Sequence, residues 1–185
     1  MEIIETSLKG AYLIKPQVFQ DERGFFLESY SKKVLEEKDI KADFIQDNHS
    51  YSAKKGTLRG LHFQLPPFEQ AKLIRVIRGS IYDVVVDLRK DSPTYLKSEN
   101  FGLSASNFHM LFVPRGFAHG FMALEDNTEI IYKVDNYYSK EYDSGIIWND
   151  PDLDIAWPMR TPILSEKDAG LQSFKDFKSR NPFEI

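Results

Sequence analysis

The sequence of 185 residues contains no cysteine. A disulfide framework, a zinc–cysteine site and a thiol nucleophile are therefore excluded. Apolar runs are short, and none approaches the roughly 18 residues that a membrane span requires. The sequence also lacks an excess of basic charge, because 24 Lys and Arg residues against 28 Asp and Glu residues give a formal net charge of −4. This balance argues against a dedicated binder of duplex nucleic acid, so we expect neither a membrane nor a nucleic-acid partner.

The first residues lack the features of a secretory signal peptide. Met1–Glu5 carries acidic side chains where such a peptide is basic, and no apolar stretch follows. We therefore expect a cytoplasmic protein. The hydrophobic content of 42% and the charged content of 28% are those of a globular chain. A chain of 185 residues suits one domain, which we place at residues 1–185.

Long helical patterns are scarce as well, whereas aromatic residues are plentiful, with 14 phenylalanines and nine tyrosines. Helical signals are confined to a short helix through Glu37 that Ser31 would cap, and to a C-terminal segment after Ser165. Short runs rich in β-branched and aromatic residues predict strands at Phe25–Tyr30, Leu73–Ile77, Ile81–Leu88, Met110–Val113 and Ile130–Val134. Short strands without crossover helices predict an all-β antiparallel sandwich or barrel.

The densest group of polar and charged residues lies between Gln46 and Lys72. If Arg59–Gln64 is extended, its side chains alternate between two faces. We then expect His62 and Gln64 on one face and Arg59 on the other. A lone histidine in a strand is more often a hydrogen-bonded structural residue than a catalyst, so this segment alone leaves both interpretations open.

A second segment, Val113–Phe121, places proline, glycine and histidine at offsets that resemble the second conserved motif of the cupin superfamily. Cupins are jelly-roll barrels, so the resemblance implies an all-β jelly-roll (cupin) barrel with short peripheral helices. Metal-binding cupins pair this motif with an earlier His-x-His, but that position here reads His62-Phe63-Gln64. Too few imidazoles remain for the usual three-ligand arrangement, so we expect no metal.

Further motifs extend along nearly the whole chain: Asp21–Phe26, Gln46–Asn48, Leu58–Gln64, Asp87–Arg89, Ser92–Thr94, Gly116–Phe121, Tyr132–Lys133 and Trp148–Pro151. In this order they resemble the dTDP-4-dehydrorhamnose 3,5-epimerase family. The resemblance implies metal-independent epimerisation at C3 and C5 of dTDP-4-dehydro-6-deoxy-D-glucose, which gives dTDP-4-dehydro-L-rhamnose in dTDP-L-rhamnose biosynthesis. Both carbons flank the C4 ketone, so the reaction requires a base, a group that stabilises the enolate, and an acid on the opposite face. Such a reaction needs neither a metal nor a redox cofactor, so we expect no cofactor.

His62 matches the family's general base, because a neutral imidazole titrates close to working pH. The carboxylate that would hold its tautomer matches Asp168. Ser165–Asp168 also fits a helix capping box, and the sequence leaves both roles of Asp168 open. Asp83, on the predicted strand Ile81–Leu88, is a second candidate partner for His62.

Three more residues match positions around the sugar. Tyr132 matches the family's general acid, because a phenol with a pKa of ~10 stays protonated at neutral pH. A buried strand tyrosine is the alternative interpretation. Lys72 matches a cation near the ketone, where a positive charge would stabilise the enolate. His119 matches a substrate-binding residue beside it.

The remaining matches are expected to bind the nucleotide: Arg23, Glu28, Gln46, Asn48, Arg59, Tyr138, Asp143 and Lys167. Arg23 and Arg59 would neutralise the pyrophosphate through planar guanidinium groups. Tyr138 would stack on the thymine ring. Asp143 departs from the family pattern, which usually has Glu here, although the acidic character is kept.

The resemblance also implies a homodimer in which N-terminal strands pack across the interface. Arg23 would then serve its own subunit's site or that of the neighbouring subunit, and the sequence leaves both open. Two alternatives stay open. An enzyme that epimerises only one carbon of a related dTDP-4-keto sugar would share His62, Tyr132 and Lys72. A non-catalytic jelly-roll binder of nucleotide sugars would be expected to lose the base or the acid, and this sequence has both.

Overall fold

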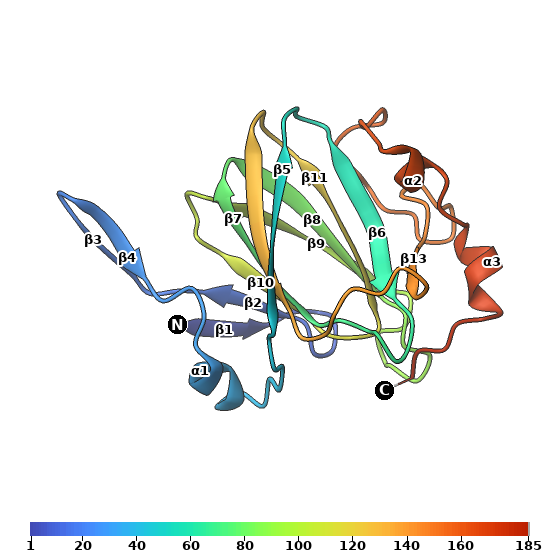
Figure 1. The fold of residues 1–185 in the computed structure, drawn as a ribbon, viewed down its shortest axis with the longest axis horizontal. Helices are drawn as coiled ribbons and strands as arrows, with labels where there is room; N and C mark the ends of the chain where they lie inside the picture. The colour runs from blue at the N-terminus through green and yellow to red at the C-terminus, as the bar shows by residue number, and fades with distance from the viewer. Residues whose placement is uncertain (185) are drawn as a thin grey trace.

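A computed structural model describes residues 1–184 as two antiparallel β-sheets packed face to face, with a separate hairpin and short helices around them (Figure 1). In sheet order, the first sheet contains β1 (Glu2–Glu5), β2 (Tyr12–Lys15), β10 (Met110–Val113), β7 (Lys72–Arg78), β12 (Thr128–Val134) and β5 (Gln46–Ser52). The second contains β13 (Asp143–Gly145), β6 (Leu58–Gln64), β11 (Phe117–Ala123), β8 (Ser80–Asp87) and β9 (Ser98–Ser104). The predicted all-β class, with a jelly-roll arrangement of two sheets, is confirmed.

The hairpin of β3 (Val18–Asp21) and β4 (Gly24–Leu27) forms its own two-stranded sheet. Figure 1 shows it in blue, projecting away from the two large sheets. The prediction of a strand over Phe25–Tyr30 was too long, because β4 ends at Leu27. Chain beyond this hairpin returns to the body through α1 (Lys32–Glu36).

The strands predicted from the sequence agree best with the strands of the structure where both faces of a strand are apolar. Met110–Val113 is β10 without change, and the other central runs fall within one or two residues of β7, β8 and β12. The strands that the patterns missed include β5 and β9, which lie at sheet edges and expose alternate residues. Their polar sequences do not produce the apolar run that marks a buried strand.

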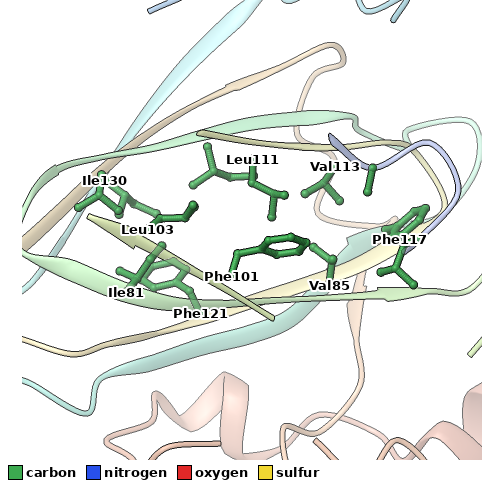
Figure 2. Packing of buried hydrophobic residues seen from close by; sticks show 13 residues of the cluster. Ile81, Val85, Phe101, Leu103, Leu111, Val113, Phe117, Phe121 and Ile130 are labelled. Carbon is green, nitrogen blue, oxygen red and sulfur yellow. The ribbon is translucent and has the colours of Figure 1, made fainter. Parts of the chain in front are cut away.

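The main core lies between the two sheets. Ile81 and Val85 of β8 meet Leu111 of β10 and Phe121 of β11, and all are buried (Figure 2). The alternate residues of β8, Val84 and Val86, belong to a second core on the outer face of its sheet. Because β8 is covered on both faces, its sequence is a nearly continuous apolar run, and a carboxylate within it needs a specific explanation.

The C-terminal segment covers that outer face. It contains α2 (Glu166–Ala169) and α3 (Phe174–Lys178). Phe177 and Phe183 pack against Phe63 of β6, and Phe174 belongs to the same core cluster. The expected C-terminal helical segment is therefore present as two single-turn helices. The expected cap of the first helix is wrong in one detail, since Ser31 stands at the N-cap of α1 without a side-chain hydrogen bond to it. In the described residues, no helix combines the length and apolarity of a membrane span.

Candidate active site

A cavity of about 310 Å³ opens between the sheets. Strands of both sheets and the start of α2 contribute its lining, which consists of Ser50, Arg59, His62, Lys72, His119, Phe121, Ile130, Tyr132, Ser165, Lys167 and Asp168. The fold therefore gathers all four predicted catalytic residues, together with three predicted substrate-binding residues, around one space. Tyr132 comes from β12 of the first sheet and His62 from β6 of the second, so the two side chains approach the cavity from opposite walls.

The shortest hydrogen bond between two side chains of the cavity lining joins His62 to Asp168. The His62 Nε2 atom lies 2.5 Å from Asp168 Oδ1, and their side chains are 29% and 6% exposed. Burial alone would raise the pKa of Asp168, but hydrogen bonds from His62 and Ser165 outweigh it and hold that pKa below the ordinary value. An ionised carboxylate can only accept, so His62 Nε2 carries the proton and Nδ1 keeps its lone pair.

Asp168 is also part of the helix cap that its sequence suggested. Its backbone N–H donates to Ser165 Oγ at 3.1 Å, and the Ser165 hydroxyl donates to Asp168 Oδ2 at 2.8 Å. The two interpretations of Asp168 therefore do not compete. The cap fixes the first turn of α2, and the turn aims the second carboxylate oxygen at His62.

A second histidine–carboxylate pair lies beside the first. His119 Nε2 is 2.9 and 3.0 Å from the two carboxylate oxygens of Asp83, whose side chain is 0% exposed. His119 is paired with His62 in the register of β11 and β6. Asp83 was the second candidate for the partner of His62, and that expectation is wrong, because Asp83 binds the neighbouring histidine instead.

Lys72 and Tyr132 have environments that shift their pKa in opposite directions. Burial lowers the pKa of the Lys72 ammonium to about 8, and the positive charge of Lys167 adds to this, while the carboxylates of Asp83 and Asp143 oppose it. Burial raises the pKa of the Tyr132 phenol, with Arg59 acting in the opposite direction. At neutral pH the cavity therefore presents a cationic amine and a protonated phenol.

The predicted alternation along β6 fails at one point. Arg59 and His62 both line the cavity, although they are an odd number of residues apart, while Phe63 lies in the outer core. The pairing of β6 with β11 shifts register between His119 and Phe121, which is the signature of a bulge. Gly60 sits at this bulge with φ +133°, and a Cβ there would lie 2.5 Å from the Cα of the facing strand. A bulge turns both polar side chains toward the same space.

At the edge of the cavity, three predicted nucleotide-binding residues contact one another. The Tyr138 hydroxyl donates to Asp143 Oδ2 at 3.0 Å, and Lys167 forms an ion pair with the same oxygen. The shorter side chain of Asp143 therefore still reaches both of its neighbours. On β5, the Gln46 amide donates to Asn48 at 2.8 Å.

Arg23 and Glu28 lie away from this cavity. Arg23 is on the projecting hairpin, where its guanidinium pairs with Asp21 at 2.5 Å while its side chain stays 86% exposed. Glu28 follows β4 and is exposed. Within a single chain, the structure does not bring these two residues to the other predicted site residues.

The sequence reasoning missed the apolar part of the lining, Phe121 and Ile130, and the hydroxyl of Ser50. Strand alternation carried a signal for Ile130, which is two residues from Tyr132 and therefore on the same face. Over residues 1–184, no three or more His, Asp and Glu side chains cluster in a way that could hold a metal ion. His62, Tyr132 and Lys72 can each accept or donate a proton, so the cavity is equipped for proton transfer to and from a bound molecule.

Comparison with known proteins gives one consistent result. The sequence model of the family described as dTDP-4-dehydrorhamnose 3,5-epimerase matches residues 5–176. The chain is 49% identical over 177 residues to a dTDP-4-dehydrorhamnose 3,5-epimerase of Shigella flexneri. The aligned region covers 95% of this chain and 97% of the Shigella protein.

Solved structures agree with this. The structure superposes with a TM-score of 0.92 on a dTDP-4-dehydrorhamnose 3,5-epimerase of Bacillus anthracis, which was crystallised with TDP and PPi bound. The two sequences are 55% identical, and the superposition covers 94% of this chain and 99% of the Bacillus chain. The structure also superposes with a TM-score of 0.93 on a dTDP-6-deoxy-D-glucose-3,5-epimerase of Legionella pneumophila in complex with dTDP-4-keto-L-rhamnose. The two sequences are 38% identical, and the superposition covers 100% of this chain and 98% of the Legionella chain.

Proposed function

The chain belongs to the dTDP-4-dehydrorhamnose 3,5-epimerase family, and we propose that it converts dTDP-4-dehydro-6-deoxy-D-glucose to dTDP-4-dehydro-L-rhamnose in dTDP-L-rhamnose biosynthesis. The observation that carries this proposal is the His62–Asp168 pair, set across the cavity from a protonated tyrosine and next to a lysine. A base, an acid on the opposite wall and a cation are the groups that inversion beside a ketone requires.

The proposed reaction begins at His62. Its Nδ1 takes the proton from C3 or C5, the C–H electron pair forms the enolate double bond, and negative charge moves onto the C4 oxygen. Lys72 stabilises that oxygen as a cation. The Tyr132 hydroxyl then gives a proton to the same carbon from the opposite face. Exchange with solvent returns the proton to the phenol and removes it from the imidazole, so the net change is inversion alone.

The nucleotide would extend from the sugar toward the remaining predicted residues. Arg59 lines the cavity and would neutralise phosphate charge. Tyr138, Asp143 and Lys167 would form the thymine end, where the phenol ring is exposed for stacking. Gln46 and Asn48 offer hydrogen-bonding groups along β5.

A homodimer is part of the proposal, with Arg23 and Glu28 acting in the neighbouring subunit's cavity. The hairpin that carries Arg23 exposes Phe19, Phe25 and Phe26 by 55%, 54% and 66%. A projecting arm with this much aromatic surface is suited to pack on another molecule. Arg75 lines a second cavity together with Ser29, which lies two residues beyond the hairpin. Its buried Nε has no hydrogen-bond partner among residues 1–184, and a second copy could supply one.

The assembly can be tested by sedimentation and by mixing variants. We expect two copies per particle. Arg23→Ala subunits mixed with His62→Ala subunits should form hybrid dimers that regain part of the activity, because one of the two cavities would combine intact residues from both chains. A fully active monomer would contradict this part of the proposal.

The function itself is tested by proton NMR of the dTDP-4-keto sugar incubated with the protein in D2O. We expect deuterium at both C3 and C5, and the rate should survive exhaustive chelation. Uptake at one carbon would indicate the narrower epimerase, and binding without exchange would indicate a nucleotide-sugar binder. A cytoplasmic location stays a prediction.

A further inference from the structure

The barrel interior contains a carboxylate that the proposed reaction does not use. Asp83 lies on β8 between Ile81 and Val85, on the face that packs into the core, and its side chain is 0% exposed. A buried charge is costly unless other groups solvate it. The position of Asp83 in an otherwise apolar strand therefore has a free-energy cost, which a function of this carboxylate would explain.

Asp87, on the same strand, shows what a structural carboxylate looks like in this protein. Its Oδ2 accepts from Arg89, Ser92 and Thr94 at 2.8, 2.5 and 2.7 Å. Asp83 is different, because its side-chain hydrogen bonds within residues 1–184 go to His119 alone. The Lys72 ammonium is the other charge that interacts with Asp83. Burial lowers the pKa of Lys72, and the negative charge of Asp83 opposes this shift.

The contact determines which nitrogen of His119 faces the cavity. Both carboxylate oxygens lie at hydrogen-bond distance from Nε2, so this nitrogen carries the proton. His119 lines the cavity, and its Nδ1 makes no hydrogen bond to any residue from 1 to 184. In the neutral ring Nδ1 is then an acceptor open to a bound molecule.

We propose that Asp83 is a positioning residue, which holds His119 with Nε2 protonated and Nδ1 free to accept a hydrogen bond from a sugar hydroxyl. This inference rests on the proposed function for the identity of the sugar. The carboxylate acts through the His119 side chain and does not itself line the cavity. Its role is to keep that acceptor in a fixed place while the enolate forms.

The direct test is NMR of protein labelled with 15N in its histidines. For the wild type near neutral pH we expect His119 with a protonated Nε2 and an unprotonated Nδ1. The opposite tautomer in the wild type would overturn the proposal without any variant. This readout does not depend on turnover, so it remains decisive even if the wild type fails to epimerise the dTDP-4-keto sugar, which would overturn the proposed function instead.

Asp83→Asn provides the second arm. The amide can donate to Nε2, so the His119 tautomer should change, as it does when an orienting carboxylate is replaced in other enzymes. We expect kcat to fall about tenfold, the size of effect that the loss of one hydrogen bond produces, with dTDP affinity unchanged. Asp87→Asn is the matched control, since it removes an equally buried carboxylate from the same strand. Per folded molecule it should keep kcat and the tautomer, although its melting temperature should fall. A wild-type kcat and tautomer in Asp83→Asn would refute the positioning role and leave Asp83 a structural residue.

Discussion

The two histidine–aspartate pairs of the cavity differ in exposure and in how the chain builds them. His62 is 29% exposed and its partner comes from a helix near the C-terminus, whereas His119 is 9% exposed and its partner lies on the adjacent strand. A base must reach both substrate and solvent, because it has to release the proton that it takes. The more enclosed pair lacks that access and is suited to hold a fixed hydrogen bond. We infer that similar pairs separate into different roles through access to solvent.

The largest expected effect comes from removing the exposed imidazole. His62→Ala should lower kcat by about 10⁴-fold, at the upper end of what general acid–base catalysis contributes. Nucleotide affinity should stay near the wild-type value, because the proposed nucleotide contacts lie elsewhere in the cavity. Turnover assays and dTDP titration check both parts. A variant that kept substantial turnover would remove His62 from the proton transfer.

Tyr132→Phe should have the next largest effect, lowering product formation by about 10³-fold. The substitution deletes the phenolic oxygen and keeps the packed ring, so folding should change little. His62 could still form the enolate and return deuterium to the original face. We therefore expect recovered substrate to contain deuterium although product is nearly absent. Loss of exchange together with product would place Tyr132 at the enolisation step.

Asp168→Asn should lower kcat by about 10²-fold, because His62 would lose the acceptor that fixes its tautomer. Ser165→Ala is the matched control. It removes the cap and should cost about 1 kcal/mol of stability with a smaller effect on kcat. If both variants lost stability equally and kept full activity, capping would be the only role of Asp168.

The same carboxylate gives a pH dependence of stability. Hydrogen bonds lower the folded-state pKa of Asp168, so its ionised form stabilises the fold above the ordinary pKa of aspartate. This contribution is lost as the pH falls through the lowered value. Thermal melts of the wild type and Asp168→Asn should therefore differ most near neutral pH and converge in acid. A constant difference at all pH values would contradict the assigned hydrogen bonds.

The smallest expected effect is a dependence of kcat/KM on pH that comes from Lys72. Burial is the main cause that lowers the pKa of Lys72 to about 8. Below that pH the ammonium can stabilise the enolate, and above it the neutral amine cannot. We expect kcat/KM to decline above pH 8. Asp83 and Asp143 raise this pKa and Lys167 lowers it, so the decline should begin at lower pH in Asp83→Asn. An unchanged alkaline limb in that variant would show that Asp83 does not act on Lys72.

The sequence predicted those parts of the molecule that depend on local pattern. Met110–Val113 is apolar throughout and was located without error, whereas the polar edge strand Gln46–Ser52 was missed. Asp168 and His62 are 106 positions apart in the sequence, and they form a hydrogen bond in the structure. Only the family resemblance predicted this contact. The partner of Asp83 depends on the register of two neighbouring strands. The common face of Arg59 and His62 depends on a bulge, and neither follows from alternation along one strand.

The central claim is that His62 transfers the proton while His119 only holds a hydrogen bond. It is tested most directly by comparing His62→Asn and His119→Asn for deuterium uptake from D2O into the dTDP-4-keto sugar. Each variant removes one imidazole, and NMR follows C3 and C5 separately. We predict that uptake at both carbons disappears in His62→Asn and persists at a reduced rate in His119→Asn. Uptake that survives in His62→Asn and is lost in His119→Asn would reverse the two roles and contradict the account.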